Sequence, residues 1–287
     1  MSARPARRGF PARLRARLRR PRPVSAVLRT DYDVGAYARA ARGRLPVDAD
    51  AIVPGGLDVR TRADLAFVHR LDAAGLTEMR AVLSTWTANE ARVTAFLATW
   101  AYERYWCARA IGDVLDADAR DRAPGRDPDA PFTRRGPLAR VRAATVEGLV
   151  PILGPLATVI VGEPLTAGQM ARLAVQEASL RAAYRALLPR LDGEARRVVG
   201  EVAERRPQMV EFFRVEAAAR ISRSRAEEIS ARLHLHRRWR ALRVVGVPDP
   251  DENRALLSLG IGEEARHELW EADAGLRSRL LTGRATD

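Results

Sequence analysis

Residues 170–191 have the sequence MARLAVQEASLRAAYRALLPRL, and this stretch decides the fold of the chain. Glu177 falls inside an apolar helix face, between Leu173 and Leu180, at about 100° per residue. A carboxylate on a buried face is costly unless it is paired, protonated or bound to a metal ion. Glu177 is therefore the first candidate site residue. The apolar residues recur at the three- and four-residue steps of an α-helix, and they are Met170, Leu173, Leu180, Tyr184, Leu187, Leu188 and Leu191.

The stretch before it contains further helical patterns. Residues 61–71 form one predicted helix and residues 77–115 a single long one. Glu90 and Arg104 lie on the apolar stripe of the long helix, and Glu103 lies on its flank. Glu90 and Arg104 are about 21 Å apart along the axis, so each needs a partner from another element. The stripe itself consists of Met79, Leu83, Trp86, Val93, Leu97, Trp100, Cys107 and Ile111.

Three more helices are expected around these. Residues 138–161 are apolar almost all round and predict a central helix that carries Glu147. Residues 194–221 predict an amphipathic helix that Pro207 interrupts, with Glu216 on its apolar side, and residues 261–281 a last helix. No stretch favours a strand, so helices of this length joined by short loops predict an all-α bundle.

The chain divides into four predicted parts. Residues 1–23 are a disordered basic tail, residues 24–60 a connector with a short helix, residues 61–222 the bundle, and residues 223–287 a basic linker with a C-terminal helix. The tail holds nine arginines between Arg4 and Arg22, so the formal charge of +13 falls to 13 − 9 = +4 without it. Such a tail attracts nucleic acid or an anionic surface weakly and without sequence preference.

Composition places the protein in the soluble class. Cys107 is the only cysteine, which excludes an intrachain disulfide and fits a cytoplasmic location. The longest uncharged run, residues 148–162, is too short to span a bilayer as a helix and contains Pro151 and Pro155. No transmembrane segment is expected.

Glu90, Glu147 and Glu177 each stand in a strongly apolar predicted helix. Helical bundles build two-metal sites by bringing carboxylates from separate helices together with Glu-x-x-His pairs. Oxygen and imidazole ligands suit iron or manganese. The three glutamates are therefore candidate metal ligands, and Glu103 and Glu216 are candidates to complete the set.

The sequence around two of these glutamates resembles a known family. Residues 86–93, WTANEARV, are similar to the Trp-Thr-Ala-Glu-Glu-x-x-His helix of the soluble acyl-carrier-protein desaturases, and residues 174–184, AVQEASLRAAY, resemble their Glu-x-x-His-x-x-x-Tyr helix. Glu147 stands about where that family has a single-Glu helix. The resemblance covers residues 77–191 and implies a ferritin-like bundle with a di-metal centre.

The chain departs from that family at the ligands. Val93 and Leu180 stand where the family has metal-binding histidines, and residues 61–77 offer only Asp64 and Asp72 for its first carboxylate. Because of these departures, the resemblance implies the fold more firmly than the reaction. A Glu-x-x-His sequence at Glu264 to His267 lies outside the matched region and is interpreted as a chance match.

Buried glutamates also have a structural interpretation. Glu177 and Glu90 could pair with arginines, and Arg104 is placed to reach into the core. Tyr184, two helical turns beyond Glu177, is a candidate hydrogen-bond partner in that core. The presence of iron or manganese, or of no metal at all, stays open on the sequence.

Three functions follow as hypotheses. The first is a ferritin-like protein with a degenerate di-metal site, acting as a non-catalytic binding or structural module, with an apolar small molecule or acyl chain as one possible ligand. The second is an active di-iron oxidoreductase of the acyl-carrier-protein desaturase type. The third is a binder of nucleic acid or acidic partners through the tail. Whether the chain is an enzyme, and whether it forms a homodimer, stay open.

Overall fold

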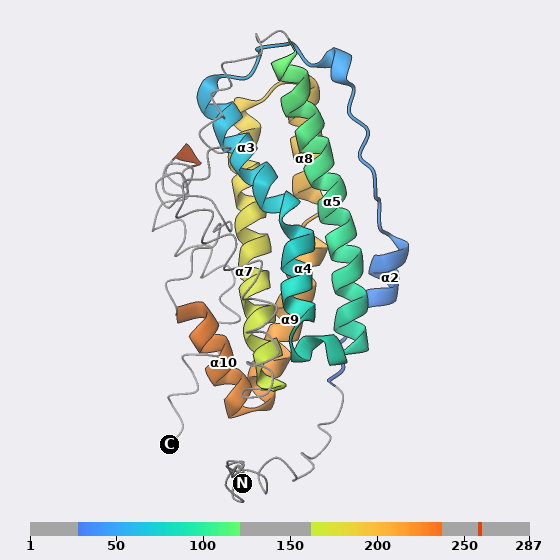
Figure 1. The fold of residues 1–287 in the computed structure, drawn as a ribbon, viewed down its shortest axis with the longest axis vertical. Helices are drawn as coiled ribbons and strands as arrows, with labels where there is room; N and C mark the ends of the chain where they lie inside the picture. Colours follow the sequence, from blue (N-terminus) through green and yellow to red (C-terminus); the bar gives the residue numbers. More distant parts are fainter. Residues whose placement is uncertain (1–27, 121–161, 237–257, 260–287) are drawn as a thin grey trace, which may run out of the picture.

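The computed structural model describes residues 28–120, 162–236 and 258–259, and every regular element in these ranges is helical (Figure 1). The all-α prediction is confirmed for this part of the chain. None of the described helices is long and apolar enough to cross a membrane. The α-helices are α2 (Val34–Arg39), α3 (Val59–Ala73), α4 (Gly75–Leu83), α5 (Ala91–Ala119), α7 (Pro164–Leu187), α8 (Gly193–Glu204), α9 (Pro207–Arg223) and α10 (Arg225–His236). Three short 3-10 helices join them: η1 (Ala49–Ala51), η2 (Trp86–Asn89) and η4 (Leu188–Arg190).

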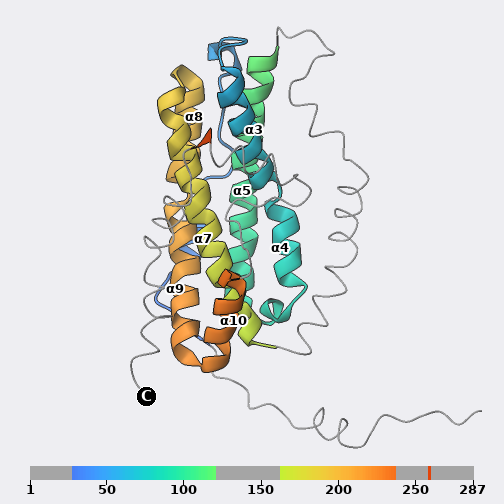
Figure 2. The ribbon, with the colours of Figure 1, turned by 90° about the vertical axis from the view of Figure 1, so that its left-hand side faces the viewer.

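Helices α3, α4, α5, α7, α8 and α9 form four columns, two of which are interrupted, and α2 and α10 lie beside these columns (Figures 1 and 2). One column is α3 followed by α4, the second is α5, the third is α7, and the fourth is α8 followed by α9. Helices α3 and α8 lie at one end of the bundle and α4 and α9 at the other. Helices α5 and α7 both run towards the α3 and α8 end, so they are parallel to each other and antiparallel to the interrupted columns.

Buried apolar side chains form two separate clusters along the bundle axis. The first, here called the α3–α8 core, joins α3 and α8 to the C-terminal halves of α5 and α7, and includes Leu65, Val68, Leu71, Ile111, Val114, Leu180, Leu187, Val198 and Val202. The second, the α4–α9 core, joins α4, α9 and α10 to the N-terminal halves of α5 and α7, and includes Val82, Phe96, Leu97, Trp100, Met170, Leu173, Met209, Phe212 and Phe213.

The prediction of one helix over residues 77–115 is wrong, because the chain breaks between α4 and α5. Thr85 has an extended backbone, and η2 separates the two helices. The Ser84 and Thr85 hydroxyls donate to the backbone carbonyls of Ala81 and Val82, at 2.8 and 2.6 Å, which competes with helix propagation. Glu90 consequently lies at the N-terminal boundary of α5 rather than inside a continuous helix.

The other predicted helices compare as follows. The helix at residues 61–71 is present as part of α3, and the expected interruption at Pro207 separates α8 from α9. Part of the stretch that was expected to be a basic linker forms α10, which packs against α7 and α9. The tail and the helices expected at residues 138–161 and 261–281 lie outside the described residues.

We predict that replacing Phe213 with alanine lowers the free energy of unfolding by about 3–5 kcal/mol. Phe213 is fully buried and meets the ring of Trp100 edge-on, with 5.5 Å between the centroids. Chemical denaturation measures the change. Val53→Ala is the control, because Val53 is 72% exposed and its loss should alter stability by less than about 0.5 kcal/mol. Equal effects of the two substitutions would contradict the packing of the α4–α9 core.

Candidate functional site: a buried arginine–carboxylate layer

Glu177 is fully buried on α7, and both of its carboxylate oxygens accept hydrogen bonds. The indole nitrogen of Trp100 on α5 donates to Oε1 at 2.9 Å, and the Arg206 guanidinium donates to Oε2 at 2.5 Å. Arg104 lies 3.6 Å from Oε1. The carboxylate is therefore held by donors from two neighbouring columns, which offsets the desolvation of its charge.

Asp72, near the C-terminal end of α3, shares these arginines. Arg206 donates to both of its carboxylate oxygens, at 2.5 and 2.6 Å, and Arg104 Nε donates at 3.2 Å. The Tyr184 hydroxyl donates to the same carboxylate. Burial alone would raise the pKa of Asp72, but the charges of Arg206 and Arg104 outweigh it and hold that pKa below its usual value.

Glu78 on α4 extends the network towards the surface. It accepts from Arg104 at 3.1 Å, from Arg172 at 2.5 Å and from Gln176 at 2.6 Å. Burial opposes its ionisation, yet Arg172 and Arg104 lower the pKa of this carboxyl below its ordinary value. Three carboxylates thus meet three guanidiniums, and the charges balance: −3 + 3 = 0.

We call Asp72, Glu78, Arg104, Glu177 and Arg206 the arginine layer. Arg104 and Arg206 are both fully buried. Burial works against their charged form, but the carboxylates around them raise the pKa of both guanidiniums above the ordinary arginine value. Both arginines therefore stay charged, and they supply positive charge at the middle of the bundle.

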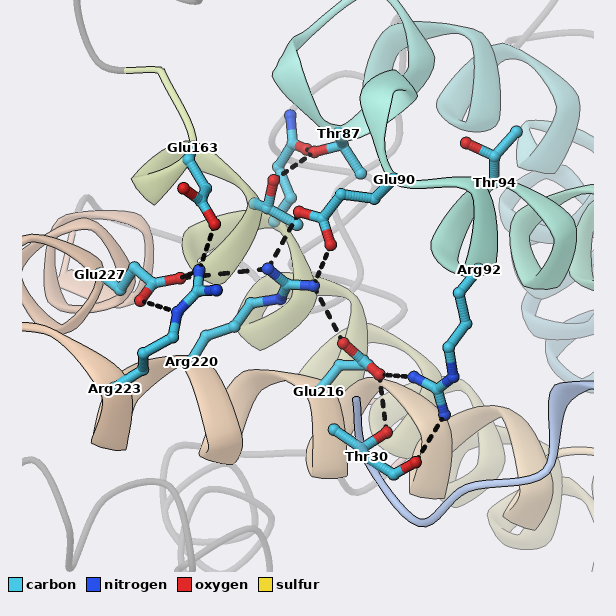
Figure 3. Close-up of polar contacts among 12 residues, drawn as sticks. Thr30, Thr87, Glu90, Arg92, Thr94, Glu163, Glu216, Arg220, Arg223 and Glu227 are labelled. Carbon is cyan, nitrogen blue, oxygen red and sulfur yellow. Dashed lines mark hydrogen bonds and ion pairs between the residues drawn. The ribbon is translucent and has the colours of Figure 1, made fainter. Parts of the chain in front are cut away.

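Glu90 and Glu216 belong to a second network, which lies at the N-terminal end of α5 (Figure 3). Arg220 donates to the two oxygens of Glu90, at 3.0 Å from Nη1 and 2.5 Å from Nη2, and to Glu216 at 3.0 Å. Arg92 donates to the remaining oxygen of Glu216, and the Thr30 hydroxyl donates there at 2.8 Å. This network joins α5, α9 and the N-terminal connector.

Glu103 forms a third pair, beside the arginine layer, because it and its partner Arg205 are the chain neighbours of Arg104 and Arg206. It is 3% exposed, accepts from the backbone N–H of Gly43 at 2.7 Å and pairs with Arg205 at 3.3 Å. Glu103 is therefore a buried, ion-paired residue and not an exposed one. The carboxylate instead ties the connector and the start of the α8–α9 junction to α5.

The candidate metal ligands do not converge on one point in the part of the chain that the structure describes. Fourteen residues separate Glu90 from Arg104, and fourteen separate Arg206 from Arg220, so the Glu90 and Glu177 networks are about 20 Å apart along the axis. Among the described residues no group of three His, Cys, Asp or Glu side chains is placed to hold a metal ion. Glu147 and the Glu264 to His267 sequence lie outside these ranges.

Val93 and Leu180, at the histidine positions of the resemblance, are core residues. Leu180 is fully buried in the α3–α8 core, and Val93 is 1% exposed in the α4–α9 core. Their apolar side chains fill the space that a ligand would need. They belong to different cores, on opposite sides of the arginine layer.

Asp72, Glu78 and Arg206 are the residues of the layer that the sequence did not single out for this site. Asp72 was noted only as a weak match for a ligand, and Arg206 is one of many arginines in a chain without lysine. The one local signal for Arg206 is its position directly before Pro207, where the helical column is interrupted.

Comparison of the chain with known proteins found no matching protein-family model, no matching curated protein and no matching solved structure.

We predict that Asp72→Asn lowers the free energy of unfolding by about 3–5 kcal/mol, because it leaves buried guanidinium charge without compensation. Urea denaturation at pH 7 measures this loss. Glu211→Gln serves as the matched control, since Glu211 and its partner Arg214 are both more than 40% exposed and such pairs contribute at most about 1 kcal/mol. A loss below about 1 kcal/mol for Asp72→Asn would show that the layer does not depend on this charge.

The free energy of unfolding should also depend on pH through two of these carboxylates, Asp72 and Glu78. The folded-state pKa values of Asp72 and Glu78 lie below their ordinary values, which are about 4 in the unfolded chain. Their stabilising contribution is therefore complete above about pH 4 and is lost as the pH falls through the folded-state values. We expect little change between pH 7 and about pH 5 and a steep fall below about pH 4, with a shallower fall in Asp72→Asn. Equal acid slopes for the two proteins would argue against this assignment.

Proposed function

We propose that this protein is a non-catalytic helical module of the ferritin-like kind, in which the arginine layer occupies the place of a di-metal centre. The observation that carries the proposal is the position of Arg104. Its guanidinium lies between the carboxylates of Asp72 and Glu78, which it contacts at 3.2 and 3.1 Å, and that of Glu177, at 3.6 Å. These three carboxylates come from three different helices.

The order and direction of the helices support this proposal. Helix α5 ends beside α3 and α8, whereas α7 begins beside α9 and α10, so these two consecutive described helices are parallel rather than antiparallel (Figures 1 and 2). Ferritin-like bundles have one long crossover connection between parallel helices, whereas simple up-and-down bundles have only short loops. The carboxylates of the arginine layer lie near the middle of the columns, where bundles of this kind place their cofactor sites.

The charges in the layer favour a structural role over metal binding. A divalent cation beside Glu177 would lie within a few ångströms of two guanidiniums that cannot release their protons, so it would be repelled by both. The carboxylate oxygens that it would need already accept hydrogen bonds from Trp100 and Arg206. On this proposal the guanidiniums replace the metal charge.

The di-iron oxidoreductase hypothesis is supported less well. It requires Glu90, Glu147 and Glu177 to share a two-metal site, in which the metal ions lie about 4 Å apart. Glu90 and Glu177 lie in networks separated by about 20 Å along the bundle, and each forms an ion pair with a different arginine. A structural or binding module needs no such convergence.

Metal analysis tests the proposal. The purified chain is incubated with Fe²⁺ or Mn²⁺, passed over a desalting column and measured for metal content and thermal midpoint. We expect well under one metal ion per chain and an unchanged midpoint, because the guanidiniums exclude a cation from the layer. About two metal ions per chain in the wild type and in the surface control Glu211→Gln, but not in Glu177→Gln, would overturn the proposal in favour of a metalloenzyme.

A further inference from the structure

The arginine layer separates the two apolar cores along both uninterrupted helices. On α5, Ala101 belongs to the α4–α9 core and Cys107 to the α3–α8 core, with Glu103 and Arg104 between them. On α7, Val175 belongs to the α4–α9 core and Leu180 to the α3–α8 core, with Glu177 between them. A continuous cross-section of buried charge thus divides the bundle.

The two remaining columns are interrupted at this same level. Helix α3 ends just after Asp72, and α4 begins at Gly75, where an added Cβ would lie 3.1 Å from the side chain of Arg104. On the other side, Arg206 separates α8 from α9, and Pro207 follows as a residue without a backbone N–H. Among the four described columns, α5 and α7 are the ones that cross the layer as unbroken helices.

The two cores are therefore joined to each other mainly by the ion pairs of the arginine layer, whereas each core is held together by apolar packing. Burial of large apolar side chains stabilises each core, and in the described bundle it is confined to one core or the other. Buried ion pairs contribute little net stability relative to apolar packing, because the desolvation of the charges offsets their attraction. Cohesion inside each core should exceed cohesion between them.

From this arrangement we propose that the bundle contains two cooperative units that open independently, with the arginine layer as the boundary between them. One unit is built on α3 and α8, the other on α4 and α9. Helices α5 and α7 link the two units, and the interruptions at Ala74 and Arg206 provide hinges in the other columns. Proteins commonly open locally in contiguous cooperative units of this kind.

Amide hydrogen exchange on the full chain with a matched pair of variants tests the proposal. Leu173 and Leu180 lie on the same helix, are both fully buried and belong to different cores. A Leu→Ala change costs about 2.7 kcal/mol or more, which corresponds to about 100-fold in an opening equilibrium. Exchange is followed by mass spectrometry under conditions where its rate reports that equilibrium.

Leu173→Ala should speed exchange about 100-fold in α4 and α9 and less than about threefold in α3 and α8. Leu180→Ala should give the reverse pattern. Equal acceleration of all four helices in both variants would overturn the proposal, because it would show a single cooperative unit.

The wild-type chain provides a second measurement in case a variant fails to fold. In increasing sub-denaturing urea, the amides of α3 and α8 should follow one opening isotherm, and those of α4 and α9 another with a different free energy and slope. One shared isotherm for all four helices would overturn the proposal.

Discussion

The guanidinium of Arg206 is the interaction on which the rest of this bundle depends. It donates to Asp72 at the end of α3 and to Glu177 on α7, and it lies at the start of α9. Three columns thus meet at one side chain, and Arg104 adds the fourth from α5. Since a buried charge is costly unless its hydrogen bonds are complete, the columns have to hold these groups in register with one another.

That requirement accounts for several features of the backbone. The α8 column is interrupted at Arg206, so the side chain can turn into the bundle from a helix boundary. The α3 column is interrupted near Gly75, where the absence of a side chain makes room for Arg104. Apolar packing then continues on each side of the layer. At the far end of the α4–α9 core, the network of Glu90, Glu216 and Arg220 ties α5 to α9 (Figure 3).

Part of this site was predictable from residue pattern alone. Glu177 and Arg104 interrupt apolar faces, and a helical period places them in the core whatever surrounds them. The pairing of buried glutamates with arginines was one of the two interpretations that the sequence left open. Glu90 was harder to place, because its predicted position assumed an unbroken helix, and the hydroxyls of Ser84 and Thr85 end that helix early.

The sequence by itself determined the helical class, the positions of most described helices and the burial of Glu177, because these depend on local periodicity. Only the tertiary structure decided which charges meet. Asp72 and Arg206 are 134 residues apart, and the position of Arg206 before Pro207 does not indicate which carboxylate it meets. The separation of the glutamates into distinct networks was likewise decided by packing, since helix breaks and column directions set which side chains share one level of the bundle.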